Sequence, residues 1–412
     1  MIWILILAAG VSGILIGGRS AVTGFLSLQY HPARLLQDFA ASVGVGGALL
    51  NAGLVAALGL GLVHLAGIQL SGPTLAAVFT MFGFGLFGKT PLNAAPIIAG
   101  VAVAARLADR RFGEYILIAL FGTALGPIVS LVAAELVPGG IGLATLAAIL
   151  AGLATGVVLP AVAIAMLRLH QGYSLYNVGL TSGMVAVFVA AGVRAAHPDL
   201  PPVGVWDPAG TPVLEGAVVI TSVVLVLAGM VLGGHGTLRR TYGLLAFDGR
   251  LPSDFCDLAS VDAALVNMGA MGIASWAVVR GLAAPMNAAV AGAVFTVIGF
   301  AAFGKHPRNS WPVVAGVILT AIVFGKPLTD PGVILAALFV TTLAPVAGQF
   351  GPVVGILAGA AHLLLVLQTG AWHAGMTLYN NGFAAGLVAT MVVAIVEWYQ
   401  ANVSQRDRRF TR

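Results

Sequence analysis

The sequence predicts an all-α membrane protein made of two inverted-topology repeats, each with about seven hydrophobic elements. Hydrophobic residues make up 59% of the 412-residue chain and charged residues only 8%, whereas charged residues make up about a quarter of an ordinary soluble domain. Apolar runs long enough to cross a hydrocarbon core of roughly 30 Å recur along the whole length. The third observation is an internal duplication, because two distant stretches carry nearly the same residues.

The duplication is clearest in a block with the pattern FGKxPxN. Residues 87–101 read FGKTPLNAAPIIAGV, and residues 303–317 read FGKHPRNSWPVVAGV, 216 positions later. The same offset aligns residues 17–101 with residues 233–317 without a gap. Duplicated halves in a strongly apolar chain are typical of transporters and channels. Polar residues inside the repeated blocks are therefore the first candidates for function.

The duplication divides the chain into four parts. The first membrane repeat covers residues 1–196. Residues 197–212 read HPDLPPVGVWDPAGTP, a proline-rich stretch that is typical of a linker. The second membrane repeat covers residues 213–400, and a basic C-terminal tail covers residues 401–412.

Seven apolar elements are expected in each half. In the first half they lie near 1–18, 39–67, 72–88, 90–105, 115–137, 141–168 and 173–193. In the second half they lie near 213–234, 255–282, 287–304, 307–325, 332–349, 351–371 and 375–398. The first element lacks the basic residues of a signal peptide and aligns with its counterpart, so it is interpreted as a membrane helix. The third and fourth elements are short and meet at a Gly-Lys-Xaa-Pro break.

The basic residues favour an inverted arrangement of the halves. With a cytoplasmic N-terminus and an odd number of crossings per half, most of the 19 Lys and Arg residues face the cytoplasm. An even number, with the third and fourth elements as one broken helix, leaves Lys89, Lys305 and Arg308 within the membrane and exports the basic tail. The positive-inside bias therefore predicts inverted halves in the cell membrane with both termini cytoplasmic. Seven crossings per half, or five with a re-entrant hairpin, both satisfy the bias, giving between about 10 and 14 in all, and the hairpin is preferred.

Both copies of the FGKxPxN block combine a lysine, a proline and an asparagine. Proline suits the first turn of a helix, where free N–H groups and the positive end of the helix dipole attract anions. The lysine adds a full charge, and the asparagine offers amide hydrogen bonds. A plain interfacial turn, with each lysine reaching the headgroups, is the alternative. The substrate-binding residues predicted in this block are Lys89, Pro91, Asn93, Lys305, Pro307 and Asn309.

A second repeated block precedes the last element of each half. His170 begins HQGYSLYNVG and His373 begins HAGMTLYNNG. Histidine can carry a proton near neutral pH, although the tyrosines equally suit an aromatic belt at the membrane interface. No metal site is predicted, because no carboxylate or cysteine lies close by in sequence. The predicted proton-coupling or pore-lining residues are His170, Tyr176, Asn177, His373, Tyr379 and Asn380.

Two further pairs of polar residues belong to the second element of each half. Asn51 and Asn267 lie deep inside it and need a partner, which is either another helix or a solute. Both alternatives stay open, and these asparagines join the predicted substrate-binding residues. Asp38 and Asp254 precede the same element and are expected to be helix N-caps.

Several classes of function are disfavoured by the sequence. The single cysteine, Cys256, rules out an intramolecular disulfide and a multi-cysteine metal site. No phosphate-binding loop, HExxH or GxSxG motif occurs, so no cofactor is predicted. The net charge of +5 does not indicate nucleic acid binding, because the basic residues lie between apolar spans.

The repeated FGKxPxN and LYNxG blocks resemble a prokaryotic family of polytopic membrane proteins known only as domain of unknown function 1576. The resemblance covers nearly the whole chain and implies a membrane fold with two internal repeats. It implies no activity, substrate or cofactor for any residue.

The residues themselves predict an integral membrane transporter or channel for a small polar, anionic solute, bound where the two halves meet. The expected partners are the lipid bilayer and this solute, and the plan is compatible with a homo-oligomer. Two alternatives stay open: a membrane-embedded enzyme that acts on a lipid or isoprenoid, and a structural membrane subunit without a solute path.

Overall fold

The structure is a computed structural model that describes residues 1–137, 140–198 and 204–402. The described residues are mostly helical and contain no strand, only two isolated β-bridges. The predicted all-α class is therefore confirmed. Most of the predicted basic tail, residues 403–412, and residues 199–203 of the predicted linker lie outside the described residues.

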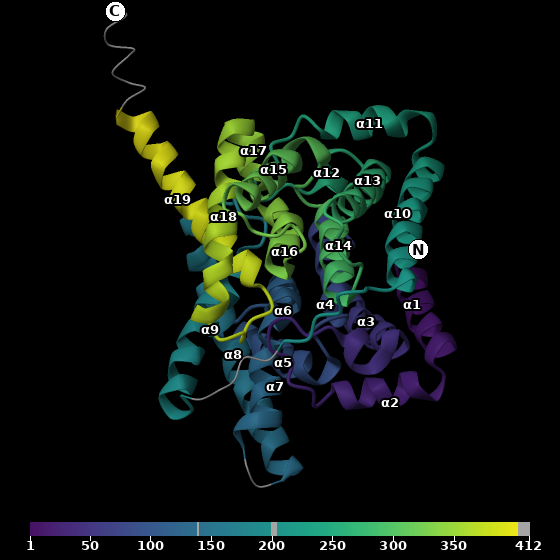
Figure 1. The fold of residues 1–412 in the computed structure, drawn as a ribbon, viewed down its shortest axis with the longest axis vertical. Coiled ribbons are helices and arrows are strands. Elements are labelled where there is room, and N and C mark those ends of the chain that lie inside the picture. The colour runs from purple at the N-terminus through teal and green to yellow at the C-terminus, as the bar shows by residue number, and fades with distance from the viewer. Residues whose placement is uncertain (138–139, 199–203, 403–412) are drawn as a thin grey trace, which may run out of the picture.

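The helices of the first half lie mainly in the lower part of Figure 1. They are α1 (Ile2–Gly17), α2 (Arg19–Leu28), α3 (Phe39–Leu65), α4 (Gly72–Gly85), α5 (Pro91–Leu107), α6 (Ile116–Gly122), α7 (Gly126–Leu131), α8 (Ile141–His170) and α9 (Asn177–Ala196). All seven predicted elements are present. The fifth is interrupted by a short 3₁₀ turn between α6 and α7.

The helices of the second half lie mainly in the upper part of Figure 1. They are α10 (Pro212–Gly233), α11 (Thr237–Leu244), α12 (Phe255–Leu258), α13 (Val261–Gly281), α14 (Ala288–Phe300), α15 (Pro307–Val323), α16 (Pro331–Phe339), α17 (Ala344–Phe350), α18 (Pro352–Trp372) and α19 (Asn380–Asn402). The predicted second element is split into α12 and α13, because Ser260 is extended and caps α13. Its counterpart Gly44 interrupts α3 at the same place, with φ of 80°.

The helices identify a multi-pass membrane protein. Within the described residues, nine helical stretches are long and apolar enough to cross a membrane, and α1 with α2 would make a tenth as a bent pair. Apolar side chains cover the outer faces, as at Val231, which is 84% exposed. The short helices α4 and α14 have 14 and 13 residues, which corresponds to about 20 Å each. Neither is long enough to cross the bilayer alone.

These two short helices form the centre of the molecule. Every residue of α14 and almost every residue of α4 is buried. The helices approach so closely that a Cβ on Gly83 would lie 2.3 Å from the carbonyl oxygen of Gly292, and the reverse distance is the same. Small residues at a helix crossing in lipid permit such an approach. The contact joins the two halves along their interface.

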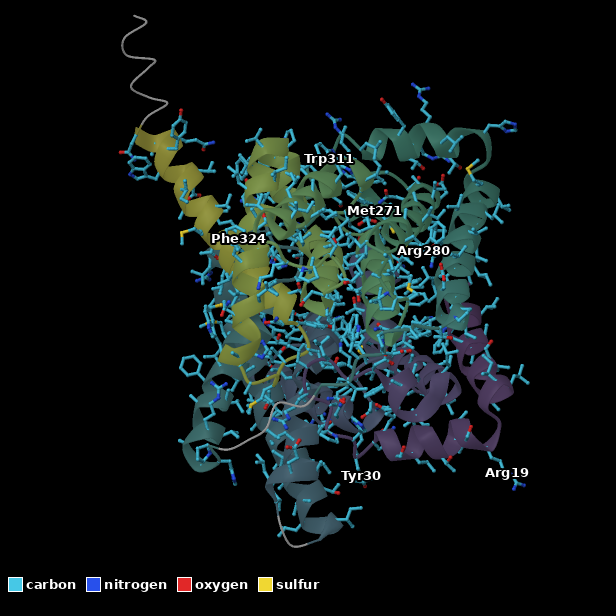
Figure 2. All side chains as sticks on the ribbon, viewed as in Figure 1. Arg19, Tyr30, Met271, Arg280, Trp311 and Phe324 are labelled. Atoms are coloured by element: carbon cyan, nitrogen blue, oxygen red, sulfur yellow. The ribbon has the colours of Figure 1, made fainter. Side chains whose placement is uncertain are left out.

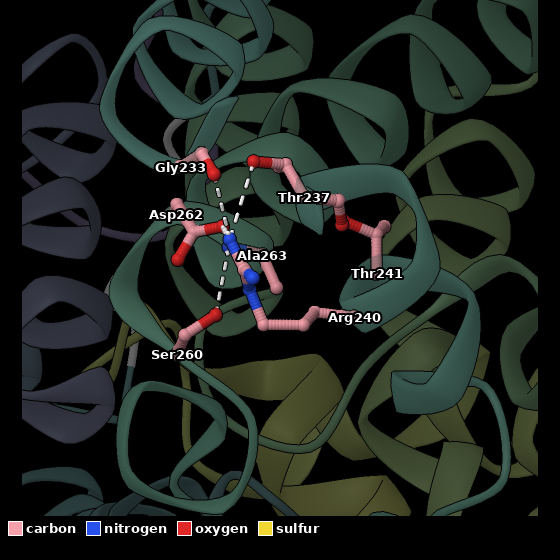
Figure 3. A network of polar contacts seen from close by, with 7 residues as sticks. All are labelled: Gly233, Thr237, Arg240, Thr241, Ser260, Asp262 and Ala263. Carbon is pink, nitrogen blue, oxygen red and sulfur yellow. Dashed lines mark hydrogen bonds and ion pairs between the residues drawn. The ribbon is translucent and has the colours of Figure 1, made fainter. Parts of the chain in front are cut away.

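Two amphipathic helices, α2 and α11, were not predicted by the sequence analysis. In Figure 1, α1 leads down to α2 at the lower end, whereas α10 leads up to α11 at the upper end. Arg19, at the start of α2, points away from the ribbon (Figure 2). The Arg240 guanidinium holds α11 in place, because it binds the Asp262 carboxylate of α13 at 2.6 Å and the Gly233 carbonyl at 3.0 Å (Figure 3).

The predicted N-caps also tie the halves together. Asp38 accepts a hydrogen bond from the Ala41 amide at the start of α3, and Asp254 accepts one from the amide two residues on. The other contact of each carboxylate crosses the interface. Asp38 accepts from the Ala288 amide at the start of α14, and Asp254 accepts from the Gly72 amide at the start of α4. Each half therefore positions the central helix of the other.

Candidate functional site

The first FGKxPxN block forms a tight turn between α4 and α5. Pro91 is the first residue of α5, as predicted, and Thr90 is its N-cap. The Asn93 side chain closes a capping box, because its Oδ1 accepts from the Thr90 amide at 2.9 Å and its Nδ2 donates to the Gly88 carbonyl at 2.9 Å. Gly88 has φ of 154°, which favours glycine. Asn93 thus fixes the shape of the turn.

The second block repeats this turn between α14 and α15. Pro307 opens α15, as predicted, and His306 occupies the position of the threonine. Asn309 accepts from the His306 amide at 3.0 Å and donates to the Gly304 carbonyl at 2.9 Å. Both asparagines face smaller cavities outside the centre, of about 10 Å³ for Asn93 and about 350 Å³ for Asn309.

Asn51 and Asn267 hold each turn from behind. The Asn51 amide donates to the carbonyls of Gly85 and Lys89, at 2.7 and 2.8 Å. The Asn267 amide donates in the same way to the carbonyls of Ala301 and Lys305, both at 2.7 Å. The sequence left two possible partners for these asparagines, another helix or a solute. In the structure, the partner is the turn that follows the neighbouring helix.

The Lys89 side chain leaves its own half and reaches the other one. Its ammonium donates to the Tyr379 hydroxyl at 2.8 Å and lies 5.5 Å from the centre of the Phe84 ring and 4.9 Å from that of Tyr379. The lysine is fully buried. Its charge is therefore held by one oxygen atom and two aromatic rings.

Lys305 makes the reciprocal contact. Its ammonium donates to the Tyr176 hydroxyl at 2.6 Å and to the Thr341 hydroxyl at 2.8 Å. It lies 4.4 Å from the centre of the Tyr176 ring and 5.2 Å from that of Phe300. Lys305 is also fully buried. Each half thus supplies a lysine to a tyrosine of the other half.

Among the residues that the structure describes, no carboxylate forms an ion pair with either buried lysine. The four ion pairs among the described residues involve arginines only. An isolated charge away from water is unfavourable unless a partner offsets it. When they are protonated, the two lysines therefore create a strong local preference for negative charge.

A continuous set of aromatic rings joins the two lysine–tyrosine pairs. The ring of Phe84 lies 4.7 Å from that of Tyr379 and 5.8 Å from that of Phe339. The ring of Tyr176 lies 6.3 Å from that of Phe339 and 4.6 Å from that of Phe300. Both tyrosines are less than 10% exposed. They lie in the interior and not in an interfacial aromatic belt.

The predicted histidines bind the asparagines of their own blocks. His170 Nε2 lies 3.0 Å from Asn177 Oδ1, and His373 Nε2 lies 3.0 Å from Asn380 Oδ1. Both histidines are fully buried, and these contacts fix the loops that precede α9 and α19. No group of three potential metal ligands occurs in the part of the chain that the structure describes.

The aromatic rings line a cavity of about 600 Å³ between the halves. It extends from the exposed residues Glu114 and Arg168 to the buried hydroxyls of Tyr176 and Tyr379. Asn177 also lines it, so three of the predicted pore-lining residues meet here. The predicted lysines contact the cavity through the tyrosines. The predicted prolines and asparagines of the FGKxPxN blocks do not line this cavity.

Several residues of this cavity were missed in the sequence. Phe84 and Phe300 are separated by the repeat offset of 216, and the same is true of Thr80 and Thr296. Their repetition was the available signal, but apolar and hydroxyl residues within apolar spans attract no attention by type. Phe339 repeats Phe121, because residues 338–345 read LFVTTLAP and residues 120–127 read LFGTALGP, so repetition was the signal here too.

Comparison with protein families gives one match. The family model described as "Protein of unknown function (DUF1576)" matches residues 8–195 and 235–398. No curated protein and no solved structure matches the chain. The two matched segments correspond closely to the two halves of the fold. With most of its length matched, the chain belongs to the DUF1576 family.

Proposed function

We propose that this protein is a membrane transporter for a small anionic solute, which binds in the central cavity between two inverted repeats. The observation that carries the proposal is the reciprocal pair of lysine–tyrosine contacts, Lys89 with Tyr379 and Lys305 with Tyr176, at the wall of one shared cavity. Lysines, tyrosines and cavity together form a site to which both halves contribute equally.

The charge of the site argues for an anion. Each phenol oxygen accepts a hydrogen bond from an ammonium group, which leaves the phenol O–H to donate into the cavity. A negative group there would stabilise the protonated form of both buried lysines. At a separation of about 4 Å and an effective dielectric constant of about 20, one such attraction amounts to about 4 kcal/mol. The asparagines Asn51, Asn93, Asn267 and Asn309 and the prolines Pro91 and Pro307 then act as positioning residues, because they fix the turns that carry the lysines.

Inverted repeats are supported by two independent observations. The first is the distribution of basic residues, which favours an odd number of crossings per half and cytoplasmic termini in the cell membrane. The second is the pair of amphipathic helices, because α2 and α11 occupy equivalent places in their halves and lie at opposite ends of the molecule (Figure 1). Tags inserted at the equivalent loops 67–70 and 283–286 should be labelled from opposite sides of the membrane. Labelling from the same side would contradict the inversion.

Among the described residues, the exposed polar residues that line the cavity are Glu114 and Arg168, which suits a carrier that is open to one side. Arg168, Gln171 and Arg250 line its outer part. Arg34, the counterpart of Arg250, is buried and binds the Glu135 carboxylate at 3.0 Å. If the two halves are inverted repeats, each half could adopt the local conformation that the other half has now. This exchange would close the cavity on one side of the membrane and open it on the other. The energy would come from a solute or ion gradient, since the sequence contains no phosphate-binding loop.

Uptake into proteoliposomes tests the proposal. The double substitution Lys89→Ala and Lys305→Ala should abolish uptake and binding of anions, because it removes both positive charges. Lys326→Ala is the matched control, since Lys326 is exposed in a loop, and it should transport normally. Unchanged uptake by a folded double variant would refute the role of the lysines.

A further inference from the structure

We infer that the transported solute is an organic anion with an apolar body, such as an aromatic or medium-chain carboxylate, and not an inorganic ion. This inference rests on the proposed function, since it specifies the ligand of the same cavity. It follows from three features of the cavity: its size, the nature of its walls and the uneven distribution of its polar groups.

The size of the cavity fits an organic molecule. Its volume of about 600 Å³ lies in the middle of the range for organic ligand sites, about 300 to 1,000 Å³. An inorganic anion would occupy a small part of this volume and leave the rest to water in contact with aromatic rings. A ligand that fills the cavity removes that contact.

The walls of the cavity are mostly apolar. Phe84 and Phe121 come from the first half, and Phe300 and Phe339 come from the second half. Phe84 and Phe300 are equivalent in the two repeats, as are Phe121 and Phe339, so rings from both halves face the same space. Aromatic rings of this kind pack against the ring or chain of a ligand. They give no stabilisation to a bare inorganic ion that would exceed the cost of removing its water.

The polar groups converge in the buried part of the cavity. The hydroxyls of Tyr176 and Tyr379 are there, each bound to a lysine. Thr80 also lines the cavity, and its hydroxyl is buried and has no hydrogen-bond partner within the described part of the chain. A buried hydroxyl without a partner is unusual, and a carboxylate beside the tyrosines would accept a hydrogen bond from it. The ligand therefore has one anionic end and one apolar end.

The outer part of the cavity is consistent with this ligand. Arg168 and Arg250 lie along it and favour the approach of an anion. Glu114 also lies there, but its carboxylate is 3.6 Å from Arg110, which offsets its charge. Ile164 and Leu167 line the same part and are exposed. A molecule with both a charged and an apolar portion suits such an entrance.

Competition binding to the purified full-length protein in detergent tests the inference. Radiolabelled benzoate is the probe, and acetate, octanoate, chloride, sulfate and benzyl alcohol are the competitors. Benzoate buries about 100 Å² more apolar surface than acetate, so it should bind about seventy-fold more tightly. Octanoate, which has a longer apolar body, should compete at least as well as benzoate does. Benzyl alcohol, which has the apolar body without the charge, should compete at least tenfold less.

Variants assign the effect to the cavity. Thr80→Val should weaken benzoate binding about fivefold without loss of folding, because the hydroxyl has no partner to lose. Thr155→Val is the matched control, since Thr155 bonds its own helix and does not line the cavity, and it should bind normally. Phe339→Ala should weaken benzoate more than acetate. Should Phe339→Ala fold poorly, Thr80→Val still decides.

The outcomes separate this inference from the proposed function. If chloride, sulfate or acetate binds as tightly as benzoate, the inference fails while anion transport stands. If benzyl alcohol competes as well as benzoate, the ligand is a neutral apolar molecule and the inference fails. If no anion binds at all, the proposed function fails and the inference fails with it.

Discussion

Replacement of Lys89 by methionine should make the protein more stable while abolishing its binding of anions. Methionine keeps most of the length and apolar volume of the lysine side chain but removes the ammonium group. Removal of a charge from water costs several kcal/mol even after relaxation. Lys89 is fully buried without a carboxylate partner among the described residues. A lysine that served the fold should stabilise the folded state. A lysine that serves ligand binding can be present although it destabilises the folded state.

The contacts of the two lysines set the size of the effect. Within the described part of the chain, Lys89 donates to one oxygen, the Tyr379 hydroxyl, and to one sulfur, that of Met81 at 3.9 Å. Lys305 donates to two oxygens, the hydroxyls of Tyr176 and Thr341. A hydrogen bond to a charged group contributes about 1.5–3 kcal/mol. Lys89→Met should therefore be more stable than Lys305→Met by about 2 kcal/mol.

Thermal unfolding in detergent measures this difference. For a chain of 412 residues, whose entropy of unfolding is about 2.1 cal/mol/K per residue, about 2 kcal/mol corresponds to roughly 2 °C in Tm. The Tm of Lys89→Met should lie above that of the unaltered protein, and the Tm of Lys305→Met should equal that of the unaltered protein or lie below it. Both variants should lose binding of benzoate. If Lys89→Met lowers Tm as much as Lys305→Met does, the ammonium stabilises the fold and the argument from uncompensated charge is wrong.

Three further predictions concern the framework of the site. Asn51→Leu should lower the free energy of unfolding by about 2–6 kcal/mol, because it leaves two buried carbonyls without a donor; a denaturant titration that shows less than about 1 kcal/mol would contradict this. Gly292→Ala should lower Tm, although alanine is the better helix former by about 1 kcal/mol, because its methyl group would lie 2.3 Å from the Gly83 carbonyl; a higher Tm would refute the close crossing. Alkylation of Cys256 should be slow near pH 8, and its rate should rise about tenfold per pH unit up to about pH 11. The reason is that burial, together with two neighbouring aspartates, raises the pKa of the thiol to about 12. A rate that reaches a plateau near pH 9 would contradict this.

Much of the fold follows from patterns that the sequence displays. The spans follow from apolar runs, and the helix starts at Pro91 and Pro307 follow from proline at the first turn. The helices α2 and α11 escaped prediction because they are short and only half apolar, so neither length nor hydropathy marks them. The break at Ser260 escaped because a single extended residue leaves an apolar run intact.

The lysines and tyrosines of the candidate site could be predicted from the sequence, but their arrangement could not. Lys89 and Lys305 were found by their repetition, and so were Tyr176 and Tyr379. Their pairing across the halves could not be predicted, because it depends on how two distant segments cross. Repetition also drew attention to asparagines whose amides hold backbone carbonyls. Repeated polar residues mark both the binding group and its supports, and only geometry separates the two.

The exchange of side chains between the halves bears on how such a molecule could arise. A shorter ancestor carrying one copy of the motif would complete this pocket only by facing a second molecule of itself. Fusion of two genes would then free each copy to change alone. Position 90 is a threonine, whereas the equivalent position 306 is a histidine. The two copies have therefore diverged at this helix cap, while the lysine directly before it is the same in both.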